Sequence, residues 1–215
     1  MTFYDHSSEE GSCPTPNLHV SSLAVASLEN NDQIMHDEDL NLRTEVESHA
    51  NMVVVGRNAI VINKSGRSAK VNAFSPEHEP LEVPIVDAVV LFECPWTGQC
   101  HILVCMNALH VVNMADNLVP PFIMREAGLV VNDVPKIHVS EPDIKDHSIH
   151  FPESDLRIQL SLWGVFSYFP TRKPTMKELV EFEDNVVALT PDEHWNPRLD
   201  VYARNEEQMV DWEGN

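Results

Sequence analysis

The chain has 215 residues, 43% of them hydrophobic, which suffices for one packed domain with extensions. Its 34 acidic and 14 basic residues give a formal charge of −20, so phosphate backbones and anionic membrane surfaces would repel it. Nucleic acid and membrane are therefore excluded as expected partners.

Residues 1–40 form an acidic segment. It is rich in Ser, Asn, Asp and Glu, and its apolar residues follow no period, which predicts a largely disordered segment. The first 25 residues lack the basic start and apolar core of a secretory signal, and no apolar run approaches the roughly 18 residues that span a bilayer. We therefore expect a cytoplasmic protein that is neither secreted nor anchored.

Residues 41–139 are expected to form a β domain, because short runs rich in Val, Ile and Leu alternate with Gly, Pro and Asn. Two connections that contain glycine, residues 64–67 and 95–99, predict hairpins. One short helix is expected over residues 120–127, with Gly128 as its C-cap. The predicted strands are Met52–Val55, Ala59–Ile62, Lys70–Phe74, Val83–Phe92, His101–Cys105 and Ala108–Val112.

Residues 140–215 form a C-terminal extension of irregular α/β character. The alternation of residues 155–169 predicts a pair of strands. Residues 175–185 predict an amphipathic helix, in which Thr175 is the N-cap and Glu178 completes a capping box. We expect the remaining residues to form an irregular tail.

A turn of four residues, Glu47-Ser48-His49-Ala50, precedes the predicted strands of the β domain. Hairpins and paired strands follow, and Asn117-Leu118-Val119 then leads into the short helix. This order resembles a retropepsin, the aspartic protease region of a copia-type retrotransposon polyprotein. In that family an Asp-Ser/Thr-Gly-Ala turn bears the catalytic acid, and an apolar pair before a helix threads behind the active-site loop. The resemblance covers residues 45–139 in detail.

The resemblance implies a retropepsin-like acid-protease monomer, which is a closed β-barrel with a flap hairpin and one short helix. It also implies a homodimer, because each chain supplies one carboxylate of a pair that shares a proton. An extended polypeptide is the expected substrate or ligand, with neither a metal nor a cofactor. The residues at the flap are Phe74, Ser75 and Pro76, and those of the structural loop behind the site are Asn117, Leu118 and Val119.

Glu47 stands where the family has its catalytic aspartate. Its extra methylene moves the carboxylate oxygens by about 1 Å, and an error of that size can cost about a hundredfold in rate. Ser48 matches the hydroxyl residue that braces the loop, His49 takes the place of the glycine, and Ala50 matches the small residue behind the turn. We therefore expect a degenerate protease that is weak or inactive.

Two other functions stay open on the sequence. One is an active homodimeric aspartic endopeptidase that processes a retroelement polyprotein. The other is an unrelated soluble β-domain interaction protein, in which Glu47 is an ordinary surface residue.

Two groups of residues raise the alternative of a metal site. Cys94, Cys100, His101 and Cys105 could form a zinc site, and His147 with His150 could form a metal pair. The interpretations that we favour are plain buried thiols in a reducing compartment and solvated loop histidines.

Overall fold

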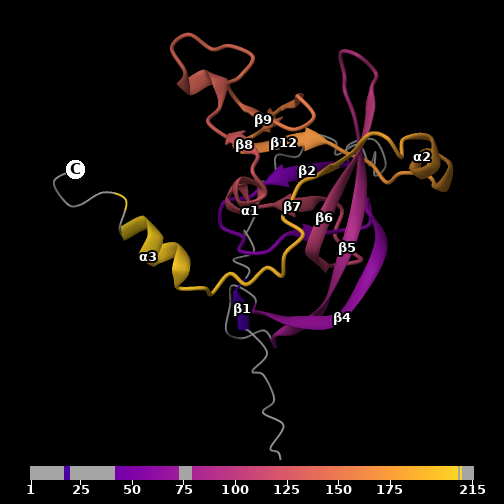
Figure 1. Ribbon diagram of the computed structural model, residues 1–215, viewed down its shortest axis with the longest axis vertical. Helices are drawn as coiled ribbons and strands as arrows, with labels where there is room; N and C mark the ends of the chain where they lie inside the picture. The colour runs from indigo at the N-terminus through magenta and orange to yellow at the C-terminus, as the bar shows by residue number, and fades with distance from the viewer. Residues whose placement is uncertain (1–16, 20–41, 73–78, 208, 210–215) are drawn as a thin grey trace, which may run out of the picture.

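The computed structural model describes residues 17–19, 42–72, 79–207 and 209 (Figure 1). Strands hold 43% of these residues and helices 13%, so the predicted mostly-β fold is confirmed. The larger sheet contains, in spatial order, β1 (Asn17–His19), β4 (Ile60–Asn72), β5 (Leu81–Glu93), β6 (Cys100–His110), β3 (Val54–Val55), β7 (Asn117–Val119), β2 (Arg43–Val46), β12 (Phe166–Pro170) and β11 (Ser161–Trp163), with β13 (Val186–Ala188) beside β6. The smaller sheet contains β10 (Leu156–Gln159), β9 (Ser148–Phe151) and β8 (Val130–Asn132).

The larger sheet does not close into the barrel that the resemblance implied. Its path of paired strands begins at β1 and ends at β11, and these two terminal strands do not pair with each other in the described part of the chain. The reason lies in the C-terminal extension, because β12 pairs antiparallel with the outer edge of β2 and β11 then adds beside β12. The edge of β2 that would serve for closure is therefore occupied.

The long strands β4, β5 and β6 form the curved ribbon at the right of Figure 1, and β5 is buried on both faces. Because side chains alternate along a strand, Ala88 and Phe92 face the main core, whereas Val89 and Leu91 face the opposite side. On that side they pack with residues of α2 (Met176–Glu181). Both faces are covered, so β5 is apolar almost throughout.

The prediction of a hairpin at residues 64–67 is wrong. β4 continues through this stretch, and the step from Lys64 to Ser68 lies opposite the shorter step from Val86 to Pro84 on β5. The extra residues form a bulge, in which Gly66 adopts a φ of 74°. The hairpin expected at residues 95–99 is confirmed, since these residues join β5 to β6.

The two predicted helices are present. α1 (Pro121–Glu126) has a proline in its first turn, and Gly128, with a φ of 79°, lies just beyond its C-cap residue. α2 begins with the predicted capping box but ends at residue 181, before the expected 185. The structure also contains a short 3-10 helix, η1 (Lys136–His138).

The remaining expectations concern the two ends of the chain. The tail expected to be irregular contains both β13 and α3 (Val201–Glu207), so that expectation is wrong there. In the segment expected to be disordered, β1 pairs with β4, whereas residues 1–16 and 20–41 lie outside the described residues. No helix among the described residues has the length and apolarity that crossing a membrane requires.

Candidate functional site

The candidate site is the turn that follows β2. β2 runs parallel to β7, with Val46 in register with Val119, and the backbone N–H of Glu47 donates to the carbonyl oxygen of Val119 at 3.2 Å. β7 also pairs with β3, so it lies between the strand that enters the turn and the strand that leaves it. Glu47 and Ser48 therefore lie at a turn directly beside Asn117–Val119, which is the arrangement that the retropepsin hypothesis requires.

A buried polar network fixes this turn from behind. Asn117 is 1% exposed, and its Oδ1 accepts from the backbone N–H of Gly56 at 2.9 Å. Its Nδ2 donates to Thr44 Oγ1 at 3.1 Å, and that hydroxyl also bonds Thr171 Oγ1 at 2.8 Å. Buried polar groups need such partners, so the network ties β7 to β2, to the end of β3 and to the extension.

The Glu47 carboxylate closes its own turn. Its side chain is largely buried, and Oε1 accepts from the backbone N–H of His49 at 2.8 Å, with the Nδ1 atom of the same residue at 3.3 Å. Oε2 has no hydrogen-bond partner among the described residues. Ser48 and His49 are exposed, with Ser48 Oγ 3.4 Å from His49 Nδ1, and Ala50 is buried. One carboxylate oxygen is thus bonded within its own turn, and the other has no bond to the part of the chain that the structure describes.

A hollow of about 280 Å³ opens beside the turn. Three segments form its wall: the turn itself, the loop after β8, and the start of β12 with the residue before it. The last two segments follow α1 in the chain, and no motif in the sequence marked them as part of a site. The lining residues are Val46, Glu47, Ser48, His49, Asp133, Pro135, Val165, Phe166 and Ser167.

A histidine and a serine are paired at the wall of this hollow. His147 Nε2 lies 2.9 Å from Ser167 Oγ, and burial lowers the pKa of His147, so the ring is neutral at neutral pH. His147 is 3% exposed, which contradicts its interpretation as a solvated loop residue. His150 is part of β9 and bonds Asp155 Oδ1 at 3.2 Å.

A second carboxylate, that of Asp133, also lines the hollow. Its Oδ1 accepts from Arg125 Nη2 of α1 at 3.1 Å, so an ion pair neutralises it. Asp133 is thus bonded to a cation of its own chain, whereas an aspartic protease needs two carboxylates that share one proton with each other. Asp133 therefore does not stand in for the missing partner of Glu47.

The predicted flap residues Phe74, Ser75 and Pro76 lie outside the described residues. The two strands that lead to them are described, and they run antiparallel from the bulge to Val71 and Leu81. This part of β4 and β5 packs on the segment after the turn, where Ala69 and Val83 contact a cluster with Met52.

The geometry gives no support to a zinc site on the described cysteines. Cys105 is fully buried, and burial raises the pKa of its thiol to about 12, whereas Cys94 and Cys100 are half-buried. Nowhere in the described part of the chain do three side chains of the kinds that bind metals come together.

Comparison of the chain with protein-family models, with curated proteins and with solved structures found no match.

Proposed function

We propose that the chain is a degenerate retrotransposon aspartic protease domain, in which Glu47 replaces the catalytic aspartate and leaves a weak or inactive enzyme that still binds extended polypeptides. The observation that carries this proposal is the crossing of strands at the turn. β7 lies between β2 and β3, and Leu118-Val119 passes directly behind Glu47 before α1 begins. A retropepsin has an apolar pair in that place.

The proposed chemistry needs two copies of the chain. In a retropepsin dimer the two carboxylates activate one water molecule, with one acting as the base and the other as the acid. The described part of one chain presents a single turn of this kind, and its other nearby carboxylate is bonded to Arg125. A second copy would bring the second Glu47.

The geometry of Glu47 supports low activity. The carboxylate reaches back to the N–H of His49, two residues later, and this bond holds one oxygen within its own chain. The longer side chain also places the oxygens about 1 Å from where an aspartate would place them, an error large enough to lose most of the rate. The second oxygen, Oε2, is unbonded within the described ranges of the chain, which supports the alternative of an active homodimeric endopeptidase.

The test compares the native chain with Glu47→Asp. Oxidised insulin B chain, an unfolded polypeptide with several apolar pairs, serves as the substrate at about pH 5, where one shared proton suits a carboxylate pair. Mass spectrometry detects the products, and circular dichroism confirms that each variant is folded at that pH. Glu47→Gln is the control for a contaminating protease, because it removes the ionisable group and keeps the size.

Three outcomes separate the functions. Cleavage by Glu47→Asp alone, at a rate that rises faster than linearly with protein concentration, supports the degenerate dimeric protease. Cleavage by the native chain, lost in Glu47→Gln, supports the active endopeptidase. If neither form cleaves although both are folded dimers, the resemblance to a protease is weakened and the unrelated β-domain protein is favoured.

A further inference from the structure

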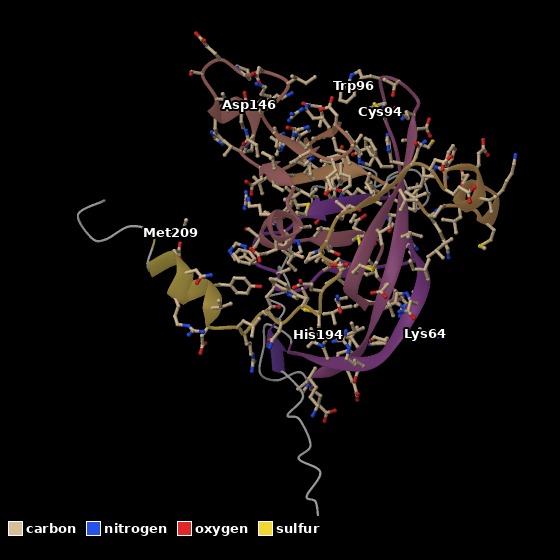
Figure 2. The ribbon with its side chains drawn as sticks, viewed as in Figure 1. Lys64, Cys94, Trp96, Asp146, His194 and Met209 are labelled. Atoms are coloured by element: carbon tan, nitrogen blue, oxygen red, sulfur yellow. The ribbon has the colours of Figure 1, made fainter. Side chains whose placement is uncertain are left out.

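A second hollow, of about 540 Å³, lies between the β5–β6 hairpin and the β11–β12 pair, and we call it the aromatic groove. Trp96, on the hairpin, is 68% exposed, and Trp163, on β11, is 58% exposed. Figure 2 shows Trp96 at the end of the hairpin. Tyr168 and Pro170 of β12 also line the groove. Large exposed rings gathered around one hollow indicate a binding surface.

Arg43 holds two of these rings in place. Its guanidinium carbon lies 3.8 Å from the centre of the Trp163 ring and 5.6 Å from that of Tyr168. The guanidinium is itself anchored, because it pairs with Glu45 at 2.8 Å and with Asp116 at 3.3 Å. Stacking of an anchored cation on a ring fixes the ring, so binding costs little side-chain entropy.

The polar groups of the groove fit an extended backbone. Neither Trp96 nor Trp163 has a hydrogen-bond partner for its indole N–H among the described residues. A polyproline II segment offers carbonyl oxygens without internal hydrogen bonds, together with proline rings that pack on aromatic faces. Exposed indoles with free N–H groups match both features.

The net charge of the chain favours proline-rich segments that carry basic residues. At −20 the chain attracts a ligand with basic flanks and repels nucleic acid. We propose that the aromatic groove binds a proline-rich peptide segment flanked by lysine or arginine, at a site separate from the Glu47 hollow. This binding does not depend on any reaction at Glu47.

The groove and the Glu47 hollow nevertheless lie near each other along β2. Side chains alternate along a strand, so Arg43 and Glu45 of β2 point to the same side, and Tyr168 is in register with Glu45 on that side. Glu47 follows directly after β2, at the turn. Four residues of extended chain place Arg43 about 13 Å from Glu47. A peptide in the groove would therefore lie near the turn.

The test measures binding of a fluorescent oligoproline peptide with lysine flanks by anisotropy, at neutral pH and low salt. We expect saturable binding that Trp96→Ala and Trp163→Ala each weaken by about tenfold or more, as for truncation of an anchor residue. Phe122→Ala, which removes an exposed aromatic ring on α1 outside the groove, is the matched control and should bind as the native chain does. Circular dichroism checks the fold of each variant, and Trp163→Phe should restore part of the affinity if Trp163→Ala alone is unstable.

Several results would overturn the proposal. The first is equal binding of a peptide in which alanine replaces every proline, because charge alone would then explain the attraction. Others are the absence of oligoproline binding and preferential binding of cellohexaose, which would make the groove a carbohydrate site. A change of oligomeric state in Trp163→Ala, without a change in peptide affinity, would instead assign the groove to a second copy of the chain.

Discussion

Asn117→Ala tests whether the buried polar network behind the turn stabilises the fold. The substitution leaves the backbone N–H of Gly56 buried without an acceptor, which costs about 1–3 kcal/mol. It also removes the hydrogen bond to Thr44, which is worth about 1 kcal/mol. We therefore expect the free energy of unfolding to fall by about 3 kcal/mol. With a urea dependence of about 2 kcal/mol per molar, the midpoint falls by about 1.5 M.

Urea unfolding followed by circular dichroism measures this loss, with Asn63→Ala as the matched control. Asn63 also donates a side-chain hydrogen bond, to Asp87 at 2.8 Å, but that bond is exposed, so its loss should cost about 0.5 kcal/mol or less. A double-mutant cycle with Thr44→Val should give a coupling energy of about 1 kcal/mol with Asn117→Ala. Equal losses for Asn117→Ala and Asn63→Ala, or no coupling to Thr44, would refute the role given to the network.

Three further predictions concern the fold. In Gly56→Ala the new Cβ would overlap the carbonyl oxygen of Met114. We therefore expect the free energy of unfolding, measured by thermal unfolding, to fall by about 3 kcal/mol. Burial lowers the pKa of His147 and of His101 below the ordinary 6.5, so the unfolded chain binds protons more readily. The free energy of unfolding should therefore be highest above pH 6.5 and should decrease as the pH falls below 6.5. Urea titrations at pH values above and below 6.5 measure this change. Thr175→Ala removes the N-cap of α2 and should cost about 1 kcal/mol in the same urea assay.

Each of these predictions has its own contradicting result. Gly66→Ala is the control for Gly56→Ala, because no atom lies within 4 Å of its new Cβ and only the backbone conformation is strained. If it costs as much as Gly56→Ala, close packing is not the cause. Stability that stays constant as the pH falls below 6.5 would show that the two histidines gain no charge on unfolding. Thr175→Ser, which retains the hydroxyl, should retain most of the stability that Thr175→Ala loses.

Local signals in the sequence predicted the elements whose causes are local. The prolines before α1, the glycine after it and the Thr175 capping box act within a few residues, and all of them are present in the structure. Gly66 led to the wrong prediction of a hairpin at residues 64–67. A glycine with a positive φ occurs in bulges as well as in hairpins, and only the pairing of the strand distinguishes the two. Which strand pairs with β2 is a long-range property that no local pattern reveals.

Part of the candidate site was likewise predicted from the sequence, and part of it was not. The resemblance to retropepsins implied that Glu47 and Asn117–Val119 lie near each other, but it did not imply the hydrogen bond that Glu47 accepts within its own turn. Asp133 reaches the hollow from the loop after β8 and Ser167 from β12 of the extension, and neither belongs to a recognisable motif. The burial of His147 was missed because Pro142 and Pro152, on either side of it in the sequence, indicated a loop, whereas packing beside β12 decides its environment.

The pairing of β2 with β12 has a consequence for how the protein matures during synthesis. The strand that presents Glu47 obtains its second neighbour only when residues 166–170 have left the ribosome, more than a hundred residues after β2 itself. Until then β2 has an open edge, which is free to pair with another chain. The nascent chain therefore passes through a stage in which the turn exists but its wall does not, and intermolecular strand pairing competes with folding at that stage.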